Sequence, residues 1–429
     1  MKKVNIALLG FGNVGMGVYR VLDTNKEDIA RRCGYEINIK RVLVKNLSKE
    51  RAIKVQEGIL TDNFCEILND DSIDIVVEVM GGEFPTLEYI LEAMKRKKHI
   101  VTANKLCMAK HRELLLKTSQ EEKVFLYYEA SVCGGMPIIK QINESLVSNK
   151  IEKIVGIVNG TTNYILTKMD EENMSFENAL KLAQEEGFAE ADPTNDIEGF
   201  DSVYKLSIMS SLCFGTTVNS DDILRQGIVR VEKEDIEYAK KLGYSIKLLA
   251  TSALKDGKIE ARVEPCLVPK NHSFSTVKDA LNAVSIKGNV VGEVVSYGQG
   301  AGPLPTGSAV VSDILSIIRC DLKYENLNHD KELKNNFSIL SKDDIESEFY
   351  IKFKLNDKEI NNREVIVDSV NKAFYKNNIK LSSITKDNEN LIILTKKCKE
   401  NLIRNAIEEI KESVEGNLNV KTIRIENFK

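Results

Sequence analysis

The 429-residue sequence predicts an α/β protein with an open parallel sheet, an inserted α+β domain and a C-terminal βαββαβ unit. Three observations lead to this fold class. An apolar run at residues 4–9 opens a series of alternating strand and helix patterns that ends near residue 130. Beyond residue 150 the pattern changes to helices followed by longer strands. After residue 349, short strands and helices follow one another in the order βαββαβ.

The first strand leads into a glycine-rich turn. The turn reads G-x-G-x-x-G and precedes the helical pattern of residues 18–25. Such glycines let the backbone turn tightly and approach a pyrophosphate, which then lies at the positive end of the helix. Strand, turn and helix in this order are the fingerprint of a Rossmann-type, NAD(P)-binding domain. The candidate cofactor-binding residues of this turn are Gly10, Phe11, Gly12, Asn13, Val14 and Gly15.

The end of the second strand, predicted at residues 37–44, bears on the choice of cofactor. An NAD site usually has an acidic residue here that binds the ribose hydroxyls. This chain instead has Lys45, Lys49 and Arg51. A solvated basic loop would explain these residues, but clustered positive charge also suits a 2′-phosphate. We therefore predict NADP, with Lys45 and Arg51 as candidate ligands, and keep NAD as the alternative.

The next strands are expected at residues 73–79, 99–105 and 124–129, with a helix over 86–96. Lys105 ends the second of these strands. It is therefore expected at the carboxyl edge of the sheet, where ligands of open α/β sheets bind. A surface lysine at a helix start is the simpler interpretation. Cys133 follows the last strand in a glycine loop, where it could be a nucleophile, although no histidine lies near it in sequence.

Residues 183–205 form an acidic stretch between two helices. Gly187 ends the first helix, and the second begins near Gly199. Asp201 and Lys205 lie one turn apart on the second helix. A surface ion pair is one interpretation and would contribute little to stability. A lysine held beside carboxylates can also donate a proton. The polar loop between the helices carries Glu190, Asp192, Asn195 and Asp196.

The remaining segments complete the domain pattern. A strand from residue 151 runs into Asn159-Gly160-Thr161-Thr162 and a helix, and further strands are expected at 245–253, 259–268 and 283–297. A second glycine-rich segment, residues 298–308, contains Gly300 and precedes an apolar helix.

Composition excludes several classes of protein. Basic and acidic residues number 60 and 64 and are well mixed, which argues against a nucleic-acid-binding face. No apolar stretch approaches membrane-spanning length, and the N-terminal run is broken by Gly10 and Gly12, unlike a signal peptide. The eight cysteines are scattered without metal-ligand spacing. We expect a soluble, cytoplasmic protein with reduced cysteines.

The acidic stretch resembles the signature of homoserine dehydrogenases. The similarity covers Gly-Phe-Ala at 187–189, Asp-Pro at 192–193, and Asp196, Asp201 and Lys205 at fixed spacing. The segments GGEFP, VTANK and NGTT are similar to the same family. The resemblance implies reversible, NAD(P)H-dependent reduction of L-aspartate 4-semialdehyde to L-homoserine in threonine, methionine and isoleucine biosynthesis. Two alternatives stay open: a phosphate-dependent semialdehyde dehydrogenase that uses Cys133, and a non-catalytic amino-acid sensor.

The resemblance also implies roles for individual residues. Lys205 would be the proton donor, with Lys105 and Asp201 as further catalytic residues. Glu190, Asp196 and Thr161 would bind the substrate, while Lys105 and Gly300 would also contact the cofactor. In some family members a glycine-rich loop and a glutamate hold a monovalent cation such as Na⁺. The residues at those positions are Glu129, Val132, Gly134 and Met136.

The resulting domain plan has four parts. Residues 1–130, completed by 300–320, form the NAD(P)-binding domain, and 131–299 form the substrate and dimerisation domain. Residues 321–348 are a linker. Residues 349–429 form a ferredoxin-like unit that resembles ACT domains, which bind amino acids. The family precedent is threonine as an effector of a homodimer or homotetramer. The usual Asp-x-Pro-Gly turn is absent, because residues 356–360 read Asn-Asp-Lys-Glu-Ile.

Overall fold

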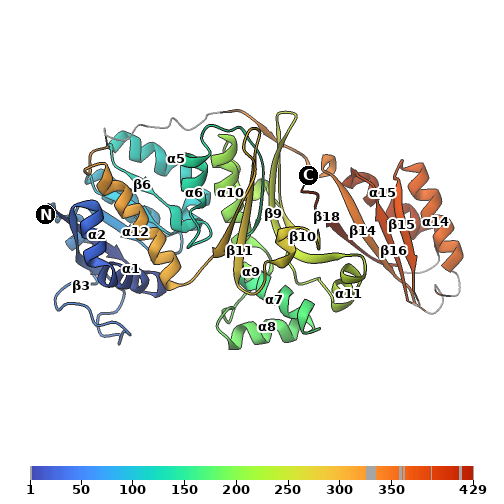
Figure 1. Cartoon of the computed structure of the whole chain (residues 1–429), viewed down its shortest axis with the longest axis horizontal. Coiled ribbons are helices and arrows are strands. Elements are labelled where there is room, and N and C mark those ends of the chain that lie inside the picture. Colours follow the sequence, from blue (N-terminus) through green and yellow to red (C-terminus); the bar gives the residue numbers. More distant parts are fainter. Residues whose placement is uncertain are drawn as a thin grey trace.

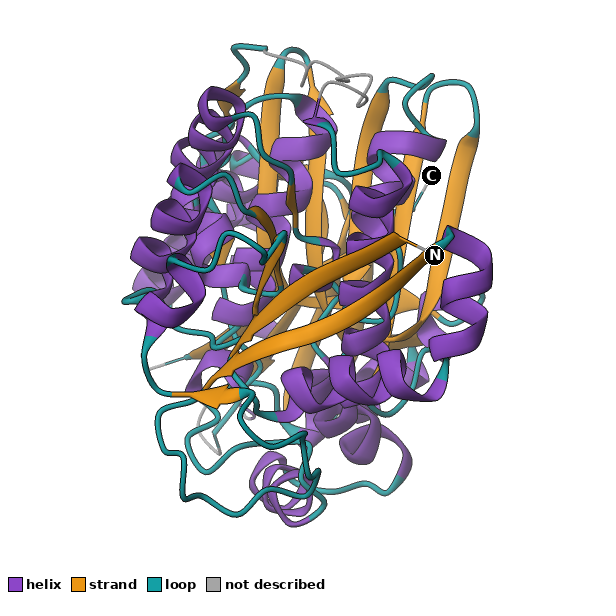
Figure 2. Ribbon diagram, turned by 90° about the vertical axis from the view of Figure 1, so that its left-hand side faces the viewer, coloured by secondary structure: helices purple, strands orange, loops and turns teal. Residues whose placement is uncertain are grey.

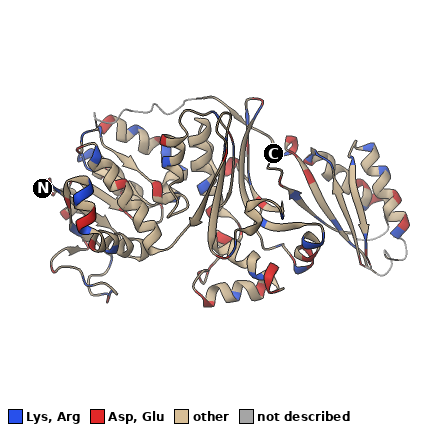
Figure 3. Ribbon diagram, in the orientation of Figure 1, with Lys and Arg blue, Asp and Glu red and all other residues tan. Residues whose placement is uncertain are grey.

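The computed structural model describes residues 2–324, 335–356, 360, 363–387, 389–414 and 418–428. The molecule is elongated (Figure 1). The N-terminal domain lies at one end, the second sheet in the middle and the C-terminal unit at the other end, while the C-terminus itself returns to the middle. Basic and acidic residues are interspersed along all three parts (Figure 3). Among the described residues, no helix is both long enough and apolar enough to cross a lipid bilayer.

A six-stranded parallel sheet organises the N-terminal domain. Its strand order, β3-β2-β1-β4-β5-β6, is that of a Rossmann fold, which confirms the predicted class. The strands are β1 (Lys2–Leu9), β2 (Tyr35–Leu43), β3 (Leu60–Thr61), β4 (Ile75–Glu78), β5 (His99–Thr102) and β6 (Leu126–Tyr127). The helices between them are α1 (Asn13–Thr24), α2 (Lys26–Cys33), α3 (Phe64–Leu68), α4 (Thr86–Lys95) and α5 (Lys105–Glu122). The last strand is shorter than predicted, because residues 129–131 turn into a 3-10 helix.

Burial explains the apolar first strand. The side chains of Val4, Ile6 and Leu8 have no exposed surface, and neither do those of Ala7 and Leu9 on the opposite face. Strands buried on both faces read as continuous apolar runs rather than as alternating patterns. Figure 2, in which this domain faces the viewer, shows helices on either side of its strands.

Helix α12 (Pro303–Arg319) returns the chain to the first domain. It packs against α1 so closely that a β-carbon on Gly17 would lie 1.9 Å from the carbonyl oxygen of Pro303. A β-carbon on Gly307 would lie 2.6 Å from the backbone of Gly17. Only glycine at these positions permits the two helices to approach this closely.

The middle of the molecule contains antiparallel strands in the order β12-β11-β7-β9-β10. They are β7 (Ile151–Ile157), β9 (Tyr244–Lys255), β10 (Lys258–Pro269), β11 (Leu281–Gly288) and β12 (Gly292–Gln299), and the short β8 (Leu224–Arg225) pairs with β10. The stretch predicted as one strand at 283–297 is a hairpin, since the chain reverses at residues 289–291. The associated helices are α6 (Ile138–Lys140), α7 (Gly160–Glu171), α8 (Phe176–Glu185), α9 (Thr194–Ile197), α10 (Phe200–Phe214) and α11 (Lys233–Lys241).

Helix α10 lies between the two domains. It contacts α5 of the N-terminal domain as well as β9 and β10 of the second sheet. Most of its residues are buried, including the polar Asp201, Ser202 and Lys205. A helix that is buried on nearly all sides is a central packing element. The ion pair predicted on this helix is therefore an interior feature, which excludes the interpretation as a surface pair.

The C-terminal unit has the predicted βαββαβ order. Its elements are β14 (Glu346–Lys354), α14 (Arg363–Lys376), β15 (Leu381–Lys386), β16 (Asn390–Thr395), α15 (Glu400–Ser413) and β18 (Asn419–Ile425), with the short strands β13 (Ser338–Ile339) and β17 (Cys398–Lys399). The strand order β18-β14-β16-β15 is that of a ferredoxin-like sheet. Phe349, Ile351 and Phe353 of β14 pack against apolar residues of both helices. Within the segment 356–360, where ACT domains have their Asp-x-Pro-Gly turn, residues 357–359 lie outside the described part of the chain.

The C-terminal unit shares its sheet with the middle domain. Strand β18 pairs in parallel with β10, matching Arg424 with Cys266 and Ile425 with Leu267. Strand β13, which falls inside the predicted linker, also pairs with β10. The described end of the linker is therefore anchored to the domain that precedes it, and one sheet runs through both parts.

Buried charges reinforce this junction. The guanidinium of Arg262 on β10 has an exposed fraction of 3% and lies 2.5 Å from the carboxylate of Glu426, just after β18. Lys153 of β7 pairs with the same carboxylate at 2.6 Å. On the other side of the junction, the buried Asp235 of α11 pairs with Lys352 of β14 at 2.5 Å. Separating the two parts would leave these charges without their partners, which is costly for buried ions.

Candidate functional site

Two lysines share one carboxylate at the contact between α5 and α10. The Nζ of Lys205 donates to Oδ2 of Asp201 over 2.7 Å, one helical turn away. Lys105, the first residue of α5, forms an ion pair with the other oxygen, Oδ1. Lys205 also donates to the carbonyl oxygen of Val158 over 2.7 Å. The fold thus brings all three predicted catalytic residues together.

Asn159 connects this cluster to the acidic loop. Its Nδ2 donates to Oδ2 of Asp201 over 2.9 Å and to Oδ1 of Asp196 over 2.6 Å. Its Oδ1 accepts from the backbone N–H of Thr162 and so caps α7. Asn159 is in the helix-starting turn predicted from the sequence, but no individual role was predicted for it. The signal available was its position as the N-cap of that helix.

Burial and charge set the protonation states of the cluster. Asp201 is 4% and Lys205 8% exposed, whereas the side chain of Lys105 is 44% exposed. Burial alone would raise the pKa of Asp201, but the positive charges of Lys205 and Lys105 hold it well below its usual range. The charge of Asp201 in turn raises the pKa of Lys105. The site therefore contains one ionised carboxylate and a protonated lysine that reaches solvent.

The predicted substrate residues occupy different environments. Asp196 belongs to the cluster, and burial followed by the charge of Asp201 raises its pKa. Glu190 is exposed on the loop after α8, close enough for its charge to help raise the pKa of Lys105. The hydroxyl of Thr161 donates to the carbonyl oxygen of Phe188 over 2.6 Å. Thr161 therefore holds the loop that carries Glu190.

The glycine turn at residues 10–15 fits a dinucleotide. Gly10 has a φ of +104°, and a β-carbon there would lie 2.9 Å from the carbonyl oxygen of Val79. A β-carbon on Gly15 would lie 2.4 Å from the oxygen of Gly10. Beside Gly12, by contrast, no described atom lies within 4 Å of that position, and no side chain caps the start of α1. This open helix N-terminus, with its N–H groups available, suits a phosphate.

The basic loop after β2 lies next to this turn, because the N–H of Gly10 donates to the carbonyl oxygen of Leu43 over 3.0 Å. Lys45 is exposed two residues further on. The guanidinium of Arg51 folds over its own loop and donates to the carbonyl oxygen of Lys49 over 2.7 Å. Arg51 therefore stabilises the loop, and Lys45 is the better-placed candidate for a 2′-phosphate.

The packing around Gly300 leaves no room for a side chain. A β-carbon there would lie 1.1 Å from Oδ1 of Asn282, and one on Gly134 would lie 2.7 Å from the oxygen of Gly300. The glycine segment is thus fixed between β11 and the loop that carries Cys133. The start of α12, at Gly302, has no side-chain cap. The contact of Gly300 with the cofactor stays a prediction.

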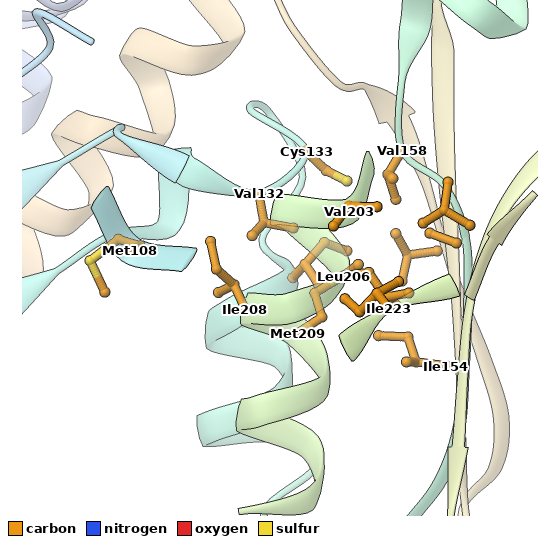
Figure 4. Close-up of a cluster of buried hydrophobic side chains, with 14 of the residues drawn as sticks. Met108, Val132, Cys133, Ile154, Val158, Val203, Leu206, Ile208, Met209 and Ile223 are labelled. Carbon is orange, nitrogen blue, oxygen red and sulfur yellow. The ribbon is translucent and has the colours of Figure 1, made fainter. Parts of the chain in front are cut away.

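Cys133 is part of the core. It is 1% exposed and belongs to a buried apolar cluster with Val132 and Val203 (Figure 4). Burial raises the pKa of its thiol to about 12. A nucleophilic cysteine needs a thiolate and access to substrate. The structure therefore argues against an aldehyde dehydrogenase that uses Cys133.

Glu129 is held by backbone groups. Its two oxygens accept from the N–H groups of Ile139 and Lys140 over 2.9 and 2.8 Å. Burial raises its pKa to about 7. The carbonyl oxygen of Met136 accepts from the N–H of Ile138. In the described part of the chain, no three His, Cys, Asp or Glu side chains gather as a metal site. The cation predicted at Glu129, Val132, Gly134 and Met136 remains a prediction.

Comparison with known proteins decides the family. Residues 137–315 match the family model "Homoserine dehydrogenase", and residues 10–129 match "Homoserine dehydrogenase, NAD binding domain". The homoserine dehydrogenase of Helicobacter pylori is 36% identical over 428 residues, which are 99% of this chain and 100% of that protein. The chain belongs to the homoserine dehydrogenase family. The homoserine dehydrogenase of Bacillus subtilis is 42% identical over 319 residues, 74% of each chain.

Solved structures of homoserine dehydrogenases agree with this assignment. The structure from Thiobacillus denitrificans has 35% identity and a TM-score of 0.93, and the match covers 100% of this chain and 99% of that one. A hyperthermophilic archaeal homoserine dehydrogenase in complex with NADPH has 26% identity and a TM-score of 0.61, over 73% of this chain and 97% of that one. The protein is thus an NAD(P)-dependent oxidoreductase that acts on a CH–OH group. The alternative of a non-catalytic sensor is not supported.

Proposed function

We propose that this chain interconverts L-aspartate 4-semialdehyde and L-homoserine at the cluster of Lys105, Lys205 and Asp201. The observation that carries the proposal is the shared carboxylate, which binds the ammonium groups of the buried Lys205 and the partly exposed Lys105. Reduction of an aldehyde places negative charge on its oxygen, and a nearby ammonium group stabilises that charge and protonates it. The nicotinamide cofactor, when bound, supplies the hydride.

The two lysines have different parts in this proposal. Lys205 is fixed by Asp201 and Val158, which use two of its three N–H groups. The third remains for the substrate oxygen, so Lys205 acts as the proton donor. Lys105 reaches the same carboxylate from the other domain and is more exposed. In this proposal its ammonium group contacts both the substrate and the cofactor while it stays paired with Asp201.

Two carboxylates close to the lysine cluster orient the substrate in this proposal. The substrate carries an ammonium group, which binds carboxylates. Asp196 of α9 is held by Asn159, and the exposed Glu190 lies on the loop between α8 and α9. We assign the ammonium group of the substrate to these two carboxylates, while Thr161 holds the loop that carries Glu190.

NADP is the proposed cofactor, with NAD as the alternative. Lys45 follows β2 where an NAD site would have an acidic residue. A hyperthermophilic archaeal homoserine dehydrogenase has been solved in complex with NADPH, which supports this choice. A monovalent cation such as Na⁺ at Glu129 remains part of the proposal by family resemblance alone.

The test is a steady-state assay of nicotinamide absorbance with homoserine or the semialdehyde and each cofactor. Turnover should require the semialdehyde or homoserine and should be faster with the phosphorylated cofactor. Loss of turnover in both Lys105→Ala and Lys205→Ala, with normal folding, would support the assigned site. Full turnover in either variant would remove that lysine from the mechanism.

For the C-terminal unit we propose an ACT-like domain that mainly supports assembly. Its strand order supports the fold, and its continuous sheet with β10 supports a structural role. The sequence lacks the Pro-Gly turn of ACT domains, so we expect weak threonine inhibition or none. Titration of the full chain with threonine tests this, because strong inhibition would contradict it.

The remaining proposals concern assembly and location. Strand β12 ends the described sheet, and its exposed Val295 and Tyr297 favour contact with a second copy in a homodimer or homotetramer. All eight cysteines are free, which agrees with a reducing, cytoplasmic location. The reaction would serve threonine, methionine and isoleucine biosynthesis. Light scattering would measure the oligomeric state.

A further inference from the structure

A buried carboxylate outside the lysine cluster lies at the carboxyl edge of the central strand β4. Glu78 is the last residue of this strand and has no exposed surface. In the sheet it stands between Leu9, which ends β1, and Thr102, which ends β5. The strand order reverses between β1 and β4, and such a switch point is where open α/β sheets bind their ligands.

Every hydrogen-bond partner of this carboxylate is a donor. Oε1 accepts from the backbone N–H groups of Met80 and Gly81 over 2.7 and 3.2 Å. Oε2 accepts from the hydroxyl of Thr102 over 2.5 Å. A carboxylate can accept all three bonds, whereas a carboxamide cannot accept on both sides.

These bonds belong to a closed ring that ends at the start of α5. The Oγ1 of Thr102 accepts from the N–H of Asn104 over 3.0 Å. The Nδ2 of Asn104 donates back to the carbonyl oxygen of Gly82 over 2.7 Å, and its Oδ1 caps α5 through Cys107. Glu78 thereby ties the glycine turn after β4 to the cap of α5.

The next residue after this cap is Lys105, whose ammonium group meets Asp201 across the domain contact. We propose that Glu78 is a positioning residue, which fixes the first turn of α5 through Thr102 and Asn104 and so aims Lys105 at Asp201. The inference rests on the role assigned to Lys105 under the proposed function. The sequence signal is an acidic residue inside an otherwise apolar strand pattern, and no role was assigned to it from the sequence.

Two matched threonine variants separate the two sides of the ring. Thr102→Val breaks the path that runs from Glu78 through the Thr102 hydroxyl to the N–H of Asn104. Thr86→Val removes a hydroxyl that donates to the carbonyl oxygen of Gly81 over 3.0 Å, a bond that is not part of the path from Glu78 through Thr102 to Asn104. Both threonines have no exposed surface, so the substitutions carry similar packing costs. Glu78→Gln serves as a second variant that keeps the volume of the side chain.

We expect Thr102→Val and Glu78→Gln to lower kcat by about tenfold or more, since misplacing a reacting group by about 1 Å is enough for such losses. NADPH affinity, measured by fluorescence, should stay near wild type. The alkaline limb of the pH–rate profile should move to lower pH, because a displaced Lys105 loses the charge that stabilises its ammonium form. Thr86→Val should change none of these quantities. If Glu78 and Thr102 only stabilised the fold, their substitution would not move the alkaline limb of the pH–rate profile.

Lys105→Ala belongs to the same series. If it turns over normally, the role of Lys105 fails and this inference falls with it. If Lys105→Ala is slow while folded Thr102→Val and Glu78→Gln match wild type in kcat and pH profile, only the positioning role of Glu78 is overturned. Loss of kcat in Thr86→Val equal to that in Thr102→Val would also overturn it.

Discussion

Replacing Asp201 by asparagine tests the shared carboxylate, because the substitution changes one charge and almost no volume. Three donors converge on its two oxygens: Lys105 on Oδ1, and Lys205 and Asn159 on Oδ2. An amide offers one oxygen and one NH₂ group. The amide oxygen of the new asparagine would take the place of Oδ2 and keep the bonds from Lys205 and Asn159. Lys105 would then face the NH₂ group, and its half-exposed side chain would turn towards solvent.

The magnitude follows from this lost contact. A hydrogen bond between charged groups contributes about 1.5–3 kcal/mol, and about 1.4 kcal/mol corresponds to a tenfold change in rate. We therefore expect kcat/KM to fall by roughly 10- to 100-fold. The alkaline limb of the pH–rate profile should move to lower pH, since the charge of Asp201 is what raises the pKa of Lys105. Stability should also fall, because the 8% exposed Lys205 loses its counter-ion.

The assay combines steady-state absorbance of NADPH, from neutral to alkaline pH, with thermal unfolding. Asp192→Asn is the matched control, because Asp192 is exposed on the loop before α9 and its side chain accepts from the N–H and the hydroxyl of Thr194. The control should behave as wild type. A folded Asp201→Asn variant with wild-type kcat/KM and an unmoved alkaline limb would refute the shared-carboxylate mechanism.

Four further predictions follow. Lys205→Arg should lower kcat by about 100-fold or more, with little change in Tm, and near-normal turnover would remove Lys205 as the proton donor. Lys45→Asp should raise KM for NADPH and spare NADH; an equal loss with both would show that Lys45 does not discriminate between them. Cys133→Ser should keep kcat, since the thiol is buried, and lost activity in a folded variant would revive the nucleophile. Glu426→Gln should weaken the domain junction. Burial by itself would raise the pKa of Glu426, but the charges of Arg262 and Lys153 hold this pKa below its usual value. The ionised carboxylate therefore stabilises the fold above the unfolded pKa of about 4.3, and this contribution is lost as the pH falls through the lower folded pKa. Acid unfolding that is equally steep in this variant and in wild type would contradict the assignment.

The contacts between β10 and the C-terminal unit also determine how stable a truncated chain should be. The sequence predicts a separable C-terminal unit, and a cut near Lys342 removes no residue assigned to catalysis. The structure shows that such a cut would uncover the edge of β10 and take Glu426 from Arg262. Exposed strand edges pair with other chains. A truncated chain should therefore unfold at lower temperature and associate, and one as stable and monodisperse as the full chain would contradict this.

The sequence by itself determined the elements and the glycine turns. Periodicity is a local property, so the apolar run of β1, the helix α8 that ends just before Gly187 and the βαββαβ order could all be predicted. The turn at Gly10 could also be predicted, because glycine is the residue that tolerates a positive φ and the close approach of the Val79 backbone. The error at residues 283–297 has the same origin, because two adjacent β-rich stretches look continuous when the reversal between them is short.

The tertiary structure alone decided which side chains meet. Asp201 and Lys105 are 96 positions apart in sequence, and only the packing of α10 on α5 makes them a pair. Asp201 and Lys205 on one helix could be paired from sequence, but not recognised as buried. The meeting of Arg262 with Glu426, and of Glu78 with Thr102, likewise depends on strand neighbours. Contacts between distant segments depend on the whole packed fold, because each is stabilised only after loop closure and burial have brought the segments together.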